Sequence, residues 1–232
     1  MNLEFYTKIK IIFFNFSYLF SDKNNFYSFL LKNIKKSNAQ VFQDLFVLYH
    51  LKNKKFGKFV EIGGGNGETI SNTYLLEKKF KWKGLICEPN TLMQKKIVIS
   101  RKAKLIKAAI TNRCKKSGVF YENKDPYQSS TINIKNNSLK KIKVNFMCLN
   151  HLLKKYKMKF IDYISIDTEG NEFQILKNFN FKKYKVYIFT IEHNFDKDKR
   201  KKIYNLLTKN KYKRIFTNIS YMDDWYILNE NN

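Results

Sequence analysis

The glycines of this chain are concentrated at one place. Four of the eight lie within the stretch 63–67, directly after an apolar run, 59–62, that contains the acid Glu61. Glycine lets the backbone adopt positive φ and turn sharply. A strand–glycine–helix turn brings backbone N–H groups and a helix N-terminus against a bound nucleotide. The stretch therefore predicts a nucleotide or nucleoside site.

The spacing of these glycines narrows the choice of ligand. The stretch reads Glu61-x-Gly63-x-Gly65-x-Gly67, one residue short of the dinucleotide fingerprint G-x-G-x-x-G. No Lys-Ser or Lys-Thr pair follows, as it would in a phosphate-binding P-loop. The remaining pattern resembles the first motif of class I methyltransferases, which use S-adenosylmethionine. A ribose-binding acid is expected about 20 residues later, and Glu88 lies 21 residues after Gly67.

Other residues near these two acids complete the predicted cofactor site. Polar side chains early in the following helix face either the cofactor or solvent, and both interpretations stay open. Small residues near position 109 leave room for an adenine ring. The predicted cofactor-binding residues are Glu61, Gly63, Gly65, Asn66, Gly67, Ser71, Asn72, Thr73, Glu88, Pro89, Ala109 and Asp167.

Acids and a histidine follow two later apolar runs and are the candidates for catalysis. Asp167 and Glu169 follow one run, and Glu192 and His193 follow the next. Ligands of open α/β sheets bind outside the carboxyl ends of strands, so these four are predicted to meet at one rim. His193 is a candidate base near neutral pH. Alternatively, Asp167, Glu192 and Asn194 ligate Mg²⁺, or Asp167 and Glu169 only orient the cofactor and cap the next helix.

An alternation of apolar and helical segments must position these residues. The sequence predicts an α/β fold with buried strands at 58–62, 84–88, 104–110, 160–167 and 186–191, closed by a hairpin of 211–217 and 225–228. Helices are predicted within 37–56 and at 67–79, 90–101, 149–156 and 196–209, the first capped by Ser37 or Asn38. The polar segment 112–141 is predicted to be functional or poorly ordered.

Composition sets the broad class. At 232 residues the chain is long enough for one α/β domain. The net charge of +26 weakly favours an acidic substrate, nucleic acid or an anionic membrane surface, but a coding bias toward lysine explains it equally well.

The three cysteines, at positions 87, 114 and 148, form no C-x-x-C motif, so reduced thiols in a cytoplasmic protein are expected. Residues 1–36 are aromatic and basic, predicting a helical extension or a peripheral membrane contact.

Four blocks in order resemble the FkbM family of S-adenosylmethionine-dependent methyltransferases. They cover roughly residues 37–228 and are Gln43-Asp44, then Gly67 through Ser71-Asn72-Thr73 with Leu76-Glu77, then Trp82-Lys83-Gly84-Leu85 with Glu88-Pro89, and finally Ile164-Ser165-Ile166-Asp167-Thr168-Glu169-Gly170-x-Glu172. The loop departs from the family's usual G-A-N-D-G, with small residues in the changed positions.

The resemblance implies a fold and an activity. The fold is a class I methyltransferase Rossmann-like doubly wound sheet, mostly parallel with an antiparallel C-terminal hairpin strand, in a domain of residues 37–232 that follows the 1–36 extension. The activity is O-methylation of a sugar, a glycan or another small hydroxylated metabolite, with S-adenosylmethionine as cofactor. The alternatives are a basic nucleic-acid-binding protein or RNA methyltransferase, suggested by charge, and a cofactor-binding protein without turnover.

Overall fold

The computed structural model describes residues 24–114, 117–123, 125, 127, 129–132 and 138–229. The basic and apolar stretch in residues 1–23, to which a membrane contact was assigned, lies outside the described residues. None of the helices in the described ranges has the length and apolar character needed to cross a bilayer.

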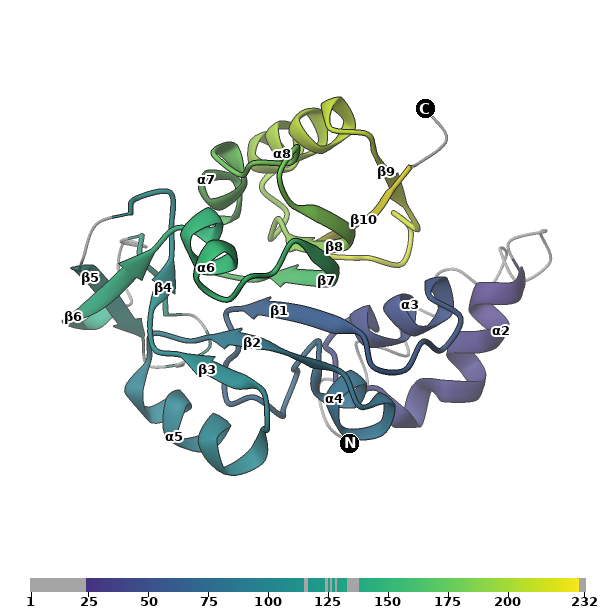
Figure 1. Ribbon diagram of the computed structural model, residues 1–232, viewed down its shortest axis with the longest axis horizontal. Helices are drawn as coiled ribbons and strands as arrows, with labels where there is room; N and C mark the ends of the chain where they lie inside the picture. The colour runs from purple at the N-terminus through teal and green to yellow at the C-terminus, as the bar shows by residue number, and fades with distance from the viewer. Residues whose placement is uncertain are drawn as a thin grey trace.

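A seven-stranded sheet forms the centre of the molecule (Figure 1). Its strands are β1 Lys58–Ile62, β2 Lys83–Cys87, β3 Lys104–Ile106, β7 Phe160–Ile166, β8 Lys185–Glu192, β9 Tyr212–Ile215 and β10 Asp223–Leu228, in the order β3-β2-β1-β7-β8-β10-β9. The first five are parallel, and β10 runs antiparallel to both β8 and β9. The predicted mostly parallel sheet with an antiparallel C-terminal strand is therefore confirmed.

Helices cover both faces of this sheet, as Figure 1 shows. One face carries α2 Asn24–Asn33, the short 3-10 helix η2 Ile34–Lys36, α3 Gln43–His50, α4 Tyr74–Phe80 and α5 Thr91–Ser100, and the other carries α6 Leu149–Lys155, α7 Glu172–Lys177 and α8 Lys197–Lys209. Successive strand residues point to opposite faces. Phe59 packs against the helices α2 to α5, and Val60 packs against α6 to α8. Both faces of the sheet are apolar because a layer of helices packs against each of them.

Two helix starts differ from the prediction. The helix expected to open at Glu68 begins at Tyr74, because the preceding residues form a loop whose backbone and hydroxyl groups bond to Glu61. The first predicted helix begins at Gln43 with no side-chain cap. Ser37 instead donates to the buried Asp44 at 2.6 Å, so its hydroxyl orders the chain before the helix.

The strand predicted at 104–110 is two strands that belong to different sheets. After β3 the chain leaves the central sheet, and β4 Ala109–Ile110 pairs in parallel with β6 Ser138–Met147. A further strand, β5 Ser117–Asn123, pairs antiparallel with β6. The segment 112–141, predicted as functional or poorly ordered, thus contributes a hairpin to a three-stranded sheet beside the main one (Figure 1).

A disulfide joins Cys114 to Cys148 across this hairpin, with the two Cα atoms 5.1 Å apart. It closes a loop of sequence separation 34 that contains the whole β5–β6 hairpin. The expectation of three reduced thiols is therefore wrong for two of them, and Cys87 is a free, buried thiol. Disulfides persist mainly in oxidising compartments, so the cysteines no longer support the expected cytoplasmic location.

Candidate active site

The ends of the central strands and the β5–β6 hairpin enclose a cavity of about 540 Å³. Its volume lies in the range that small-molecule sites occupy. Of the predicted site residues, those that line it are Glu61, Gly63, Gly65, Ser71, Asn72, Glu88, Pro89, Ala109, Asp167, Glu169 and Glu192. The hairpin and the segment joining its strands contribute a wall that sequence reasoning missed, made of Phe120, Asn123, Asp125, Tyr127, Ser129 and Thr131.

The glycine loop lies so close to its neighbours that two of its positions cannot carry a side chain. At Gly63, with φ of +86°, a Cβ atom would stand 1.6 Å from the carbonyl oxygen of Asp167. At Gly65, with φ of +51°, it would stand 2.8 Å from the ring of Tyr127. Glycine alone satisfies both the backbone angles and the space. The loop thereby places its backbone directly against the cavity, as the motif predicts.

Glu88 ends the second strand at the cavity, where the motif spacing predicts a ribose acceptor. Its Oε2 accepts a hydrogen bond from Gly65 N at 3.0 Å, and its Oε1 accepts one from Asn90 N at 2.8 Å. Burial raises the pKa of the Glu88 carboxyl to about 7, although the two N–H donors act in the opposite direction. An ionised carboxylate has about four acceptor sites, so two remain for the hydroxyls of a ligand.

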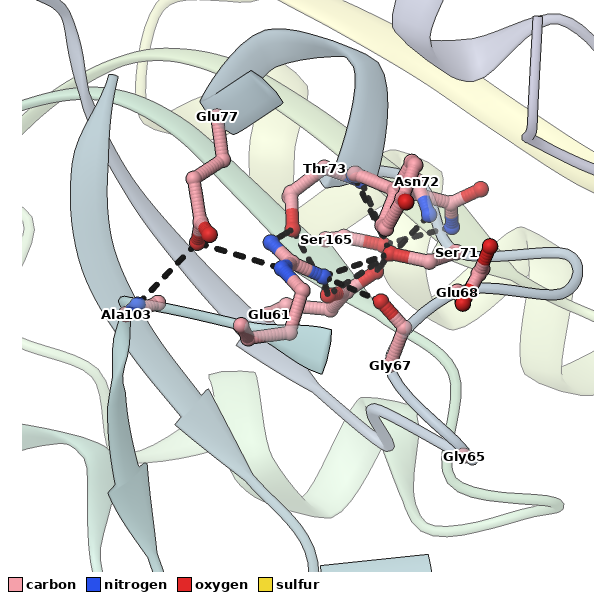
Figure 2. A network of polar contacts seen from close by, with 12 residues as sticks. Glu61, Gly65, Gly67, Glu68, Ser71, Asn72, Thr73, Glu77, Ala103 and Ser165 are labelled. Atoms are coloured by element: carbon pink, nitrogen blue, oxygen red, sulfur yellow. Dashed lines mark hydrogen bonds and ion pairs between the residues drawn. The ribbon is translucent and has the colours of Figure 1, made fainter. Parts of the chain in front are cut away.

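Glu61 does not have this freedom, because the loop that follows the glycines surrounds it (Figure 2). Its carboxylate accepts hydrogen bonds from Ser71 Oγ at 2.9 Å, Asn72 N at 2.7 Å and Thr73 Oγ1 at 2.7 Å. These residues were predicted to bind the cofactor. The hydroxyls of Ser71 and Thr73 are instead directed at Glu61, and the set holds the loop in place.

Arg101, which sequence reasoning did not single out, completes this network from the end of α5. Its Nη1 donates to Gly67 O at 2.7 Å and lies 3.5 Å from Glu61 Oε2, while its Nε donates to Glu77 Oε2 at 3.1 Å. The guanidinium side chain is fully buried. One cation therefore connects the glycine loop, the first strand and α4.

Asn72 is the member of this loop that offers an unused group to the cavity. Its Nδ2 donates to Ser165 Oγ at 2.8 Å, whereas its Oδ1 is buried and has no hydrogen-bond partner among the described residues. A buried acceptor without a partner costs free energy, and Asn72 lines the cavity. Next to the glycine loop, the cavity therefore fits a ligand that presents a hydrogen-bond donor to Asn72.

Three predicted cofactor residues lie outside the cavity wall. Asn66 uses its Oδ1 to accept from Glu68 N at 2.9 Å and Thr69 N at 2.8 Å, so it shapes the loop. Gly67 and Thr73 hold Arg101 through the Gly67 carbonyl oxygen and the Thr73 hydroxyl. These three residues therefore stabilise the glycine loop without lining the cavity.

Asp167, Glu169 and Glu192 come together in the cavity wall, with Asp167 next to the glycine loop. One oxygen from each lies within 4.8 Å of those of the other two. Removal from water raises the pKa of Asp167 to about 6 and that of Glu169 to about 7, and the acids nearby add to both shifts. Burial, with Asp167 beside it, raises the pKa of Glu192 far above its usual range. This part of the predicted rim forms.

His193, the candidate base, is absent from the residues that line the cavity. It is buried, and its Nδ1 accepts a hydrogen bond from Phe195 N at 3.1 Å. Burial lowers the pKa of the imidazole. The next residue, Asn194, does line the cavity, so the turn after β8 directs alternate residues toward and away from it.

Glu172 fixes the loop that carries Asp167 and Glu169. Its Oε1 accepts from Thr168 N at 3.0 Å and Gly170 N at 2.9 Å, and its Oε2 accepts from Lys199 Nζ at 2.7 Å. Glu169 has a positive φ of 55°, a conformation that costs energy for a residue other than glycine. The Gly-x-Glu spacing in the sequence was the available signal for this support.

Comparison with known proteins agrees with this architecture. A family model, the methyltransferase FkbM domain, matches residues 61–221. No curated protein matches the sequence. Among solved structures, the methyltransferase FkbM from Methylobacillus flagellatus KT shares 11% identity, covering 88% of this chain and 60% of that chain with a TM-score of 0.47.

Two further structures are similar to the chain. Precorrin-6y C5,15-methyltransferase from Geobacter metallireducens GS-15 shares 11% identity over 74% of this chain and 71% of that chain, with a TM-score of 0.44. The METTL16 methyltransferase domain shares 13% over 79% of this chain and 64% of that chain, with a TM-score of 0.44. The chain thus spans less than two thirds of the length of the METTL16 and Methylobacillus structures.

The strand order and the family match together establish the predicted class I methyltransferase fold. Residues 61–221 are more than half of the chain. The chain therefore belongs to the FkbM methyltransferase family.

Proposed function

We propose that this methyltransferase uses S-adenosylmethionine to methylate an oxygen of a sugar, a glycan or another small hydroxylated metabolite. The observation that carries the proposal is that two groups of residues line one cavity. The glycine loop, Asn72 and Glu88 form the first group, and the carboxylates of Asp167, Glu169 and Glu192 form the second, with Asp167 next to Gly63. The first group suits the cofactor, and the second suits an acceptor rich in hydroxyl groups.

Each part of S-adenosylmethionine would have a partner among the residues that line the cavity near the glycine loop. Asn72 Oδ1 would accept from the amino group, and Glu88 would accept from the ribose hydroxyls, as charge-assisted bonds when ionised. Pro89 and Ala109 would border the adenine ring. Bound S-adenosylmethionine supplies an activated methyl group, so transfer requires chiefly alignment of the acceptor oxygen with it.

On the acceptor side, the acids provide hydrogen-bond acceptors. Hydroxyl groups are donors that carboxylates bind well, and a carboxylate at bonding distance can take the hydroxyl proton during transfer. Asp167 directly follows β7, and Glu172 holds the loop after it through Thr168 N and Gly170 N, so its carboxyl has a fixed place in the cavity wall. We assign it the role of base.

The acid cluster also distinguishes this proposal from methylation of RNA. The net charge of +26 favours a polyanion, yet three acids line the cavity in which we propose that the acceptor binds. A phosphate backbone close to these carboxylates would be repelled. The charge therefore acts, in this proposal, away from the three acids.

The experiment combines cofactor binding with an acceptor panel. Calorimetry with S-adenosylmethionine is expected to give one binding event per chain. Methyl transfer from labelled cofactor is then measured with sugars, sugar nucleotides, glycan fragments and RNA. Transfer to hydroxylated small molecules supports the proposal. Transfer to RNA alone, or cofactor binding without transfer to any acceptor, would overturn it.

A further inference from the structure

Three acids at the cavity form no ion pair with any Lys, Arg or His among the described residues, although the chain is rich in cations. The sequence contains 45 Lys and Arg residues against 19 Asp and Glu. Among the described residues, Asp167, Glu169 and Glu192 nevertheless form no ion pair, although their oxygens lie within 4.8 Å of one another. Like charges this close repel strongly when partly buried. The arrangement is costly unless something neutralises it.

The neighbouring basic and polar groups are already engaged elsewhere. Lys199 lies nearby but donates to Glu172 Oε2 at 2.7 Å. Asp223, which pairs with Glu192 across β8 and β10, accepts from Gln43 Nε2 at 2.7 Å. The surroundings therefore add a further acid. Asp167 and Glu192 share a side-chain hydrogen bond, which leaves Glu192 Oε2 without a partner.

Glu192 supplies a second, independent observation. The residue is 4% exposed, and its Oε2 is buried with no hydrogen-bond partner among the described residues. A buried carboxyl oxygen without a hydrogen-bond partner costs free energy. Glu192 lines the cavity together with Asp167 and Glu169, so a ligand held by all three would satisfy this atom.

We propose that Asp167, Glu169 and Glu192 bind one hard divalent cation, Mg²⁺, Mn²⁺ or Ca²⁺, through one oxygen each. Such ions prefer oxygen ligands. Ligand oxygens of one ion lie between about 3 Å apart when adjacent around Mg²⁺ and about 4.8 Å apart when opposite around Ca²⁺, and the three oxygens lie within 4.8 Å of one another. Three protein ligands leave the cavity side of the ion open.

The role of this cation rests on the proposed function. An open position on the ion would hold the acceptor hydroxyl and lower its pKa. The ion would also restrict acceptors to those that present an oxygen toward it. This ligand set contains Glu169 in place of Asn194, the third ligand considered from the sequence, whose side chain is exposed at the cavity edge.

The test measures cation binding directly, without methyl transfer. The full chain, stripped with EDTA and free of S-adenosylmethionine, is titrated with Mn²⁺ by electron paramagnetic resonance and with Mg²⁺ and Ca²⁺ by calorimetry. We expect one saturable Mn²⁺ site per chain, displaced by the other two ions. Glu192→Gln should lower affinity by about tenfold or more, because the charge of the ligand set controls affinity.

A matched control removes the same charge elsewhere. Asp198 is exposed on α8 and belongs to no part of the cavity wall, so Asp198→Asn should bind Mn²⁺ as the wild type does. Glu192→Gln also relieves repulsion, so it is expected to fold and to melt at a higher temperature than the cation-free wild type. Mg²⁺ should raise the melting temperature of the wild type and leave that of Glu192→Gln unchanged.

Two outcomes contradict the cation site. One is the absence of saturable binding at millimolar cation, and the other is equal binding by wild type and Glu192→Gln. If S-adenosylmethionine binds and its methyl group is transferred to a hydroxylated small molecule while no cation binds, the cation site is wrong and the proposed function stands. If the cation binds while S-adenosylmethionine does not, the proposed function is wrong and the cation site stands.

Discussion

The Nη1 atom of Arg101 lies 3.5 Å from Oε2 of Glu61, and both side chains are buried. The same nitrogen donates to the carbonyl oxygen of Gly67 at 2.7 Å. The arginine thus ties the acid that precedes the glycines to the last glycine of the loop. Correct placement of the cofactor loop depends on this contact, although Arg101 does not line the cavity.

We first predict that Arg101→Ala lowers the free energy of unfolding by about 3–5 kcal/mol, since removing one partner leaves a buried charge unpaired. Urea denaturation measures this difference. The control is Lys102→Ala, which removes an exposed charge from the adjacent residue and should change stability by less than about 0.5 kcal/mol. Equal unfolding free energies for the two variants would show that the buried network is dispensable.

A second prediction concerns Glu88. Glu88→Ala should weaken S-adenosylmethionine binding by about 1–3 kcal/mol, because it removes charge-assisted hydrogen bonds to the ribose. Calorimetry at fixed pH provides the measurement. Glu68→Ala is the matched control, since Glu68 is exposed beside the same loop and should leave affinity unchanged. Wild-type affinity in Glu88→Ala would place the ribose elsewhere.

The third prediction is a pH dependence that follows from the same residue. The pKa of Glu88 is raised to about 7 by burial, so the carboxyl is largely protonated at pH 6 and largely ionised at pH 8. The ionised form accepts more strongly, so affinity for S-adenosylmethionine should rise as pH increases through 7 and level off above it. Glu88→Ala should lose this component of the pH profile, and a profile identical to the wild type would contradict the assignment.

The fourth prediction separates the two candidate bases. Asp167→Asn should reduce turnover by about 10²–10⁴-fold, the typical contribution of general base catalysis. His193→Ala should retain turnover within a few-fold, because the imidazole lies outside the cavity wall. Methyl transfer to the acceptor found in the panel measures both, and circular dichroism checks that both variants fold. The reverse pattern would return His193 to the role of base.

The fifth prediction tests the disulfide. Alkylation of unreduced, denatured protein should label one cysteine, Cys87, and reduction should expose all three. Reduction should also lower the unfolding free energy by about 3–4 kcal/mol, the chain-entropy estimate for a loop of this size. A Cys114→Ser, Cys148→Ser double variant is the control and should not respond to reductant. Three labelled cysteines before reduction would contradict the bond.

Much of the central sheet follows from local sequence. The run 58–62 is apolar and ends in glycines, and the structure places β1 at those residues. Strands β2, β7 and β8 and the helices α5 and α8 also lie within a residue or two of their predicted ranges, whereas α7 was not predicted. Buried parallel strands are apolar on both faces, so their signal is strong and needs no knowledge of distant partners.

The errors lie where distant residues decide the outcome. Residues 109–110 continue an apolar run, yet they pair with Phe146 and Met147 of β6, more than 30 positions away. The start of α4 depends on hydrogen bonds to Glu61. The disulfide requires Cys114 and Cys148 to lie close together in the fold. No local sequence pattern specifies such long-range contacts, because they depend on how separate elements pack.

The rim shows the same division. The acids 167, 169 and 192 were found from their positions after strands, because the ends of neighbouring strands must adjoin. The orientation of His193 could not be predicted in this way, because it depends on the turn after β8, where Asn194 has a positive φ of 48°. Strand ends place a residue at the correct edge, while the backbone of the following turn decides which side chain faces the ligand.

The loop closed by Cys114 and Cys148 separates two tasks that one chain must perform. Within it lie Phe120, Asn123, Tyr127 and Ser129, which line the cavity, whereas Glu61 and Glu88 lie outside it. Lengthening such a loop costs only about 0.6 kcal/mol per doubling, and the cross-link fixes both of its ends. Exchange of the segment between Cys114 and Cys148 with that of a relative would therefore change the acceptor preference and leave the cofactor-binding residues Glu61 and Glu88 unchanged.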